Sequence, residues 1–177
     1  MDESWLVAIV GFGSALLGAL IGGLAALLLD VWRRSLDGLA AARLVRMDLV
    51  HNQTVLTAVL AAGIGVPNLR YPSLEHMTLL APLLDEVALA LLCRDLALVS
   101  VVQQKIDEMN PQARGAGLES APALDAWRVD IAARSGDLRA LERVPKRSHM
   151  WRLLFHGRPA TNDELLEAVG RDLLPKG

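Results

Sequence analysis

The side chains of this chain that most readily bind a metal ion or act as a nucleophile are four histidines and a single cysteine. A zinc site needs such ligands at short, characteristic spacings, and no pair here has the spacing of a zincin, a zinc finger or a C-x-x-C motif. The cysteine has no histidine beside it in the sequence to activate its thiol. We therefore interpret all five as structural or surface residues and predict no metal, cofactor or nucleophilic site. These residues are His51, His76, Cys93, His149 and His156.

Two pairs of adjacent carboxylates are the remaining candidates for general acid–base chemistry, Asp85–Glu86 and Asp107–Glu108. Both lie in a stretch with helical periodicity, where adjacent side chains point about 100° apart. Neither pair is therefore positioned to act on one reacting group. A glycine-rich segment at residues 11–14 lacks the preceding strand and the lysine of a phosphate-binding loop. We predict that the chain is not an enzyme, has no catalytic residue and takes no small-molecule substrate.

The longest apolar stretch, residues 5–29, reads WLVAIVGFGSALLGALIGGLAALLL and contains one polar side chain, Ser14, and no charge. A helix of this length rises about 37 Å, more than the roughly 30 Å hydrocarbon core of a bilayer. A cleaved signal peptide is shorter and begins with basic residues, whereas this chain begins with Asp2 and Glu3. A buried core helix rarely runs this far without a charge. We therefore predict a transmembrane anchor over residues 1–30.

Charged and aromatic residues at the two ends of this span predict its orientation. No basic residue precedes it, whereas Arg33 and Arg34 follow it directly, and basic residues favour the cytoplasmic side. Trp5 and Trp32 stand at the two ends, where interfacial aromatics are common. The composition, with far more arginine than lysine, suggests a GC-rich bacterial or viral genome. We expect a single-pass protein of the bacterial inner membrane, with its N-terminus outside and residues 31–177 in the cytoplasm.

The predicted span has two unlike faces. At about 100° of rotation per residue, small side chains fall on one half of the helix and large aliphatic ones on the other. Small residues let two helix backbones approach closely, so this segregation favours self-association, or pairing with another membrane protein, over a simple abundance of glycine and alanine. The predicted association face consists of Gly11, Ser14, Ala15, Gly18, Ala19, Gly22, Gly23 and Ala26.

Length and composition predict one helical domain behind the anchor. The chain has 177 residues, and removing the anchor leaves about 145, enough for one domain with its own core. Apolar residues make up 53% and aromatic residues only 4%, with leucine and alanine dominating, which favours helices over sheets. The net charge of −2 gives no field that would attract nucleic acid. We therefore predict an all-α fold and no nucleic-acid partner.

Residues 31–110 are predicted to form a long antiparallel helical hairpin. The first arm continues the anchor helix to residue 62, with a bend near Gly38. After a turn, Ser73 caps a second arm that runs to Asn110, in which Pro82 marks a kink or a false start. Asn52, which matches a glycosylation acceptor, should be unmodified within the first arm. The apolar positions that recur at helical spacing along the first arm include Leu36, Leu39, Leu44, Met47, Val55 and Val59.

A flexible link over residues 111–122 and shorter helices over 123–174 complete the predicted domain. In the first of these helices, Ser135-Gly136 is a possible interruption, and Thr161 to Glu164 forms a capping box for the last helix. The predicted core stripe of the first helix is Leu124, Trp127, Ile131, Leu138 and Leu141.

Residues 77–102 are apolar but carry Asp85, Glu86, Arg94 and Asp95, each costing about 2.5–3.5 kcal/mol at the centre of a bilayer. We therefore reject a second span there. Arg94 lies within an apolar stripe. Our first interpretation is that Arg94 forms an ion pair or extends its charged group to solvent. The second is that it is a polar residue that determines the register or the partner of the helix.

Residues 143–158 combine five basic side chains with apolar ones and contain no acid. We rank three interpretations: a short helix docked on the bundle, then a contact with anionic membrane lipid, then a contact with nucleic acid. The residues expected to touch anionic lipid, in this segment and beside the span, are Arg33, Arg34, Lys146, Arg147, Trp151 and Arg152.

Together these features predict a membrane-anchored interaction or scaffold protein that self-associates, or pairs with another membrane protein, through the small-residue face. The alternative is a small bacterial or viral factor that assembles in the bilayer and perturbs it. A single span with a large extramembrane domain counts against a pore.

Overall fold

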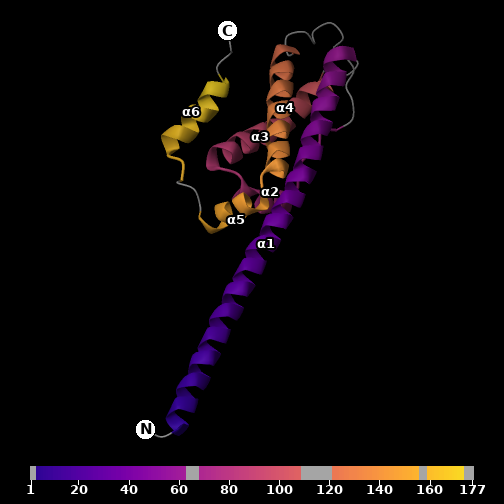
Figure 1. Cartoon of the computed structure of the whole chain (residues 1–177). Helices are drawn as coiled ribbons and strands as arrows, with labels where there is room; N and C mark the ends of the chain where they lie inside the picture. The colour runs from indigo at the N-terminus through magenta and orange to yellow at the C-terminus, as the bar shows by residue number, and fades with distance from the viewer. Residues whose placement is uncertain (1–2, 63–67, 109–120, 156–158, 174–177) are drawn as a thin grey trace.

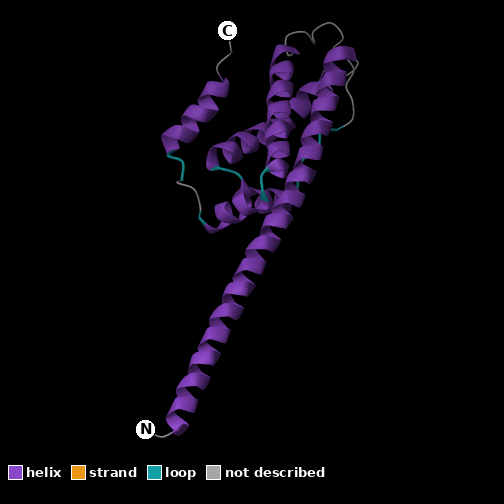
Figure 2. Cartoon of the chain, viewed as in Figure 1, coloured by secondary structure: helices purple, strands orange, loops and turns teal. Residues whose placement is uncertain are grey.

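The computed structural model describes residues 3–62, 68–108, 121–155 and 159–173. Within these ranges the chain is helical and contains no strand, which confirms the all-α fold class (Figures 1 and 2). The link predicted at residues 111–122 falls almost entirely outside the described residues. The elements are α1 (Glu3–Ala62), α2 (Leu74–Leu80), the 3₁₀ turn η1 (Ala81–Leu83), α3 (Glu86–Glu108), α4 (Ala121–Arg143), α5 (Lys146–Leu154) and α6 (Asn162–Leu173).

Helix α1 is continuous over 60 residues, so the apolar N-terminal stretch runs on into the domain as predicted (Figure 1). Every residue from Val7 to Asp30 is exposed. Burial begins at Val31 and then recurs every three or four residues, the repeat expected of a helix packed along a neighbour. The buried positions that define this repeat are Val31, Ser35, Gly38, Ala42, Val45, Leu49, Asn52, Leu56 and Val59.

The apolar positions that recur at helical spacing on this part of α1 are only partly buried. Val55 and Val59 are buried and Leu39 is half-buried. By contrast, Leu36 and Met47 are 42% and 61% exposed, and Leu44 is exposed as well. The buried stripe is built in part from small and polar residues, which let other helices approach closely and which a search for large apolar side chains does not find.

Helix α4, rather than the second arm of the expected hairpin, is the main antiparallel partner of α1 (Figure 1). The core stripe predicted for α4 is confirmed, because its five residues are all buried. The helix is not interrupted at Ser135-Gly136. Glu142, near the end of α4, lies 3.8 Å from Arg43 and 3.7 Å from Arg46 of α1.

The expected second arm is divided where Pro82 stands. Ser73 caps α2 as predicted, accepting a hydrogen bond from the His76 amide. Proline then occupies the first turn of η1, and Leu84 after it is extended, with φ −95° and ψ 151°. The side chain of Asp85 accepts a hydrogen bond from the Ala88 amide at 2.7 Å and starts α3 in a new direction. The chain therefore leaves α1 after α2, and α3 packs against α4 and α6.

Gly38 is a point of close contact between α1 and residues 79–83, which belong to α2 and η1. A Cβ atom at this position would lie 2.6 Å from Cδ1 of Leu83 and 2.8 Å from the carbonyl oxygen of Leu79. The second neighbour is a backbone atom, which cannot move away by a side-chain rotation. Gly38 therefore stands within a continuous helix as a packing residue.

Gly38→Ala should lower the free energy of unfolding by about 1–3 kcal/mol, because the added methyl group overpacks this contact. The matched control is Gly136→Ala in α4, whose Cβ would have no neighbour within 4 Å. That control should gain about 0.5–1 kcal/mol from the higher helix propensity of alanine. Urea unfolding of the full chain in micelles, followed by circular dichroism, measures both. Equal effects of the two substitutions would show that the contact is absent.

Asn52 is fully buried and holds the loop that precedes α2. Its Nδ2 donates a hydrogen bond to the Arg70 carbonyl oxygen at 3.0 Å, and its Oδ1 accepts one from the Arg70 amide at 2.7 Å. The amide side chain thus replaces a backbone partner for both polar groups of Arg70. Asn52, the first residue of the pattern that matches a glycosylation acceptor, therefore has a structural role.

Asn52→Ala should cost about 1–3 kcal/mol of stability, because it leaves both backbone groups of Arg70 without their partner. Thr54→Ala, an exposed change in the same turn of α1, should stay within about 0.5 kcal/mol of wild type. The same urea titration compares them. If Asn52→Ala lowered the free energy of unfolding as little as Thr54→Ala, the proposed role of the Asn52 side chain would be excluded.

Candidate functional site

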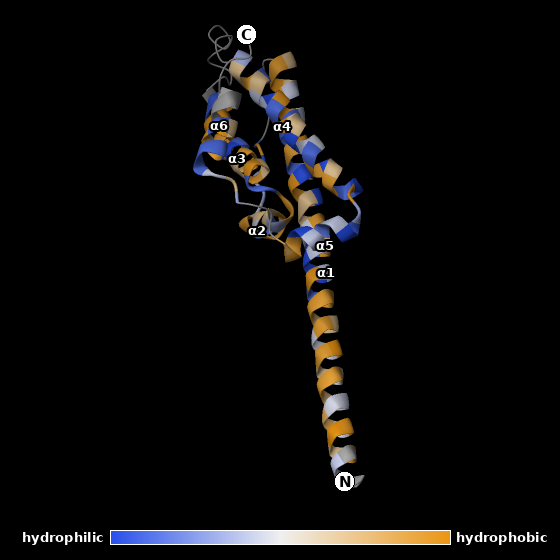
Figure 3. Cartoon of the chain, turned by 60° about the vertical axis from the view of Figure 1, so that its left-hand side comes forward, coloured by the Kyte–Doolittle hydropathy of each residue, from blue (hydrophilic) through white to orange (hydrophobic). Residues whose placement is uncertain are grey.

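The N-terminal half of α1 is the most distinctive surface of the protein. Among the described residues, α1 is the one helix long and apolar enough to cross a membrane, a criterion of length and composition alone. Its large side chains project away from the bundle; Ile21, for example, is 67% exposed. Figure 3 shows the hydrophobic colour running along this half up to the edge of the bundle. In water such a surface would be strongly unfavourable.

The predicted association face lies entirely on this exposed half, and all eight of its residues are exposed. A Cβ placed on Gly11, Gly18, Gly22 or Gly23 would meet nothing within 4 Å. The hydroxyl of Ser14 donates to the Gly11 carbonyl oxygen at 2.9 Å and is thus satisfied within the helix. The face therefore presents bare backbone that another helix could approach closely.

This face continues beyond the apolar half of α1. Eighteen residues make about five full turns of an α-helix, so Leu36, Ala40 and Leu44 lie on the same side of α1 as Gly18, Gly22 and Ala26, respectively. All six residues are exposed. The buried repeat that begins at Val31 lies on the opposite side, where the bundle packs. One side of α1 is thus uncovered from residue 18 to residue 44 and mostly small or apolar, with the exposed Arg33 between its two groups.

Only some of the residues expected to touch anionic lipid lie close together in the structure. Arg33 and Arg34 are exposed on α1, and Arg34 pairs with Asp30 at 2.8 Å. Helix α5 lies beside α1 at the end of the bundle nearest the apolar half (Figure 1). Lys146 and Arg147, in its first turn, line a cavity together with Trp32 of α1.

The other two expected lipid contacts have protein partners. Trp151 stacks on Phe155 with ring centroids 4.8 Å apart, although both rings remain largely exposed. Nη1 of Arg152 donates a hydrogen bond to the Leu83 carbonyl oxygen at 3.1 Å. Helix α5 also contacts α1 and η1. Residues 146–154 therefore form a short helix docked on the bundle, which was the first-ranked interpretation of this segment.

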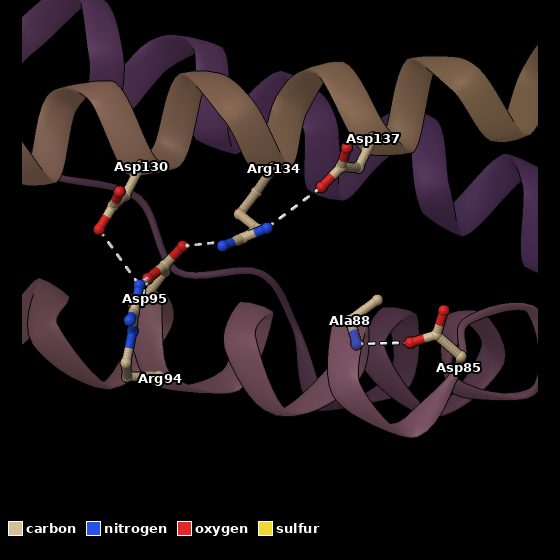
Figure 4. A network of polar contacts seen from close by, with 7 residues as sticks. All are labelled: Asp85, Ala88, Arg94, Asp95, Asp130, Arg134 and Asp137. Carbon is tan, nitrogen blue, oxygen red and sulfur yellow. Dashed lines mark hydrogen bonds and ion pairs between the residues drawn. The ribbon is translucent and has the colours of Figure 1, made fainter. Parts of the chain in front are cut away.

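A network of charges joins α3 to α4 (Figure 4). Asp95 is fully buried beside Arg94, and its Oδ2 lies 3.3 Å from Nε of Arg134. Arg94 also reaches Asp130 at 3.2 Å, and Arg134 reaches Asp137 at 3.2 Å. Burial raises the pKa of Asp95 above its usual value, even though the two arginines oppose the shift. Arg94 is thus the ion-paired arginine of the first interpretation, and the network links two helices.

The buried polar residues are only indirectly visible in the sequence. Asp95 was visible as a charge in an apolar stretch, but its partners on α4 are more than thirty positions away. His149 is buried on α5, and burial followed by the positive charge of Arg152 lowers its pKa. Among the described residues, no three histidine, cysteine, aspartate or glutamate side chains gather as metal ligands.

No known protein family, no curated protein and no solved structure matches this chain, so the assignment of function rests on the geometry above.

The stability of the protein should fall as the pH drops below about 6.5, the ordinary pKa of histidine. The unfolded chain binds a proton at His149 in that range, whereas the folded state, with its lowered pKa, does not. His149→Gln should therefore lose less of its unfolding free energy than wild type between neutral pH and pH near 5.5. Urea titrations at several pH values measure this difference. The half-exposed His76, replaced in the same way, is the control, and identical pH profiles for wild type and His149→Gln would contradict the assignment.

Proposed function

We propose that this protein is a single-pass membrane scaffold that self-associates along one side of α1 and presents its helical bundle in the cytoplasm. The observation that carries the proposal is the uncovered side of α1, on which the row Gly18, Gly22 and Ala26 continues after five turns as Leu36, Ala40 and Leu44. Small residues suit close packing in lipid, where no hydrophobic effect drives association. Exposed leucines suit packing in water, where burial of apolar area does.

A second copy of the chain is the partner that this arrangement favours. In a parallel pair with two-fold symmetry, each residue of the row faces its own counterpart, so small residues meet in the membrane and Leu36, Ala40 and Leu44 meet outside it. The Arg33 side chains of the two copies lie between these groups, at the proposed membrane surface, where they can turn outward to headgroups. The bundle packs on the opposite side of α1 and leaves this approach open. Another membrane protein with a similar helix remains the alternative partner.

The location follows from the charges beside the proposed span. Arg33 and Arg34 follow it, and Lys146 and Arg147 lie next to its end, which favours a cytoplasmic bundle and a contact with anionic lipid. The proposed location is the inner membrane of a bacterium. No catalytic activity, cofactor or nucleic-acid partner is part of the proposal.

Gly18→Leu/Gly22→Leu should reduce the crosslinked dimer of the full-length protein in membranes about tenfold, because the leucines hold the backbones apart. The control Leu20→Ile/Leu24→Ile alters the opposite side of the same helix and should crosslink like wild type. Mass spectrometry identifies the partner in the crosslinked band.

A dimer that is insensitive to the glycine changes would refute association through this face. A band that contains another membrane protein would replace self-association by pairing. Loss of membrane potential on expression would instead favour the alternative, a factor that perturbs the bilayer.

A further inference from the structure

A cavity of about 320 Å³ lies where the first turn of α5 meets α1. Its apolar lining comes from Leu28, Leu29 and Trp32 of α1 and from Met150 of α5. These α1 residues are the last ones of the apolar stretch and the tryptophan just beyond it. If α1 spans a bilayer as proposed above, the cavity lies at the level where acyl chains meet headgroups.

Ser35 gives this cavity a polar group without a partner. The residue is 2% exposed, and its Oγ forms no hydrogen bond with any described group. A buried hydroxyl without a partner is unfavourable, and in a helix serine commonly bonds to a carbonyl oxygen of the preceding turn instead. Ser35 is among the residues that line the cavity, which places an unpartnered hydroxyl at its wall.

Two cationic residues and a helix end lie beside this cavity, whose own lining is almost wholly apolar. Lys146 and Arg147 line it, both are exposed, and neither forms an ion pair with the described residues. They stand in the first turn of α5, which contains no acidic residue, and Pro145 before it provides no side-chain cap. The positive end of the helix dipole therefore adds to their charge.

We propose that this cavity binds one anionic phospholipid of the cytoplasmic leaflet. The start of an acyl chain packs on Leu28, Leu29 and Met150, while the phosphate group lies between Lys146 and Arg147. The hydroxyl of Ser35 donates to an ester or phosphate oxygen of the same lipid. Such a lipid would fasten α5, and with it the bundle, to the end of the span. This inference rests on the proposed membrane anchoring and is independent of self-association.

Native mass spectrometry of the full-length protein in detergent tests the site by counting bound lipids as phosphatidylglycerol or phosphatidylcholine is added. Wild type should retain one phosphatidylglycerol in preference to phosphatidylcholine. Lys146→Ala/Arg147→Ala should weaken this binding about tenfold, because two charge-assisted contacts are lost. Ser35→Ala should weaken it less. The control Arg139→Ala/Arg143→Ala removes the same charge from exposed positions of α4 and should bind like wild type.

Equal retention of the two lipids, or equal weakening by the α5 variant and its α4 control, would overturn the proposal. Displacement of the lipid by inorganic phosphate alone would assign the site to a free anion instead. Extraction of the protein from membranes by alkaline carbonate would show that the anchoring itself is wrong, whereas a protein that resists extraction but retains no lipid would refute the lipid site alone.

Discussion

The continuous backbone of α1 is the feature on which the rest of the structure depends. A helix satisfies its own amide and carbonyl groups, so one uninterrupted helix is suited both to hydrocarbon and to water. The change between the two surfaces occurs at Asp30 and Val31, where exposure on every side of the helix ends and the regular burial of one stripe begins. All the described buried residues of α1 lie after this point.

The bundle covers one side of α1 and leaves the other open. Small residues on the covered side, Gly38 and Ala42 among them, bring α2, η1 and α4 close to the α1 backbone. The buried Asp95 and its arginines then link α3 to α4 at some distance from α1. This one-sided construction explains how a long helix can be both the central element of a domain and a surface available to a partner.

Much of the fold could be predicted from sequence because its signals are local. The cap at Ser73 is present, and Thr161 and Glu164 form the expected reciprocal capping box, with hydrogen bonds of 2.8 and 3.3 Å. The α4 stripe and the continuity of α1 also depend on residues within a few turns of one another.

The errors concern contacts between distant segments. Pro82 was recognised as a possible kink, yet the direction in which α3 leaves depends on the extended Leu84 and the Asp85 cap, and the pairing of α1 with α4 followed from that turn. Leu36, Leu44 and Met47 recur at helical spacing but are exposed, because side-chain hydrophobicity alone does not reveal the space that Gly38 and Ala42 leave for a neighbouring helix. Ser35, Asn52 and His149 were not recognised as buried, since each is surrounded by residues far away in the sequence.

The small-residue face of α1 and the point where the bundle begins could be located from the sequence, but the continuation of this face alongside the bundle could not. The row of small residues was visible as spacing, whereas its continuation through Leu36 and Leu44 became apparent only when the bundle was seen to occupy the opposite side. Likewise, Lys146 and Trp32 are separated by more than a hundred residues and share a cavity only because α4 returns the chain along α1.

Oxidative crosslinking of Ala40→Cys in a Cys93→Ser background, in membranes, tests most directly whether α1 pairs along its open side. Ala40 is exposed between Leu36 and Leu44 of the proposed interface, outside the proposed span, and Cys93 is the only native cysteine. Pairing along the open side of α1 predicts a covalent dimer for Ala40→Cys and a monomer for Ala140→Cys, an exposed alanine on α4. A monomer at Ala40, or the same yield at both positions, would contradict it.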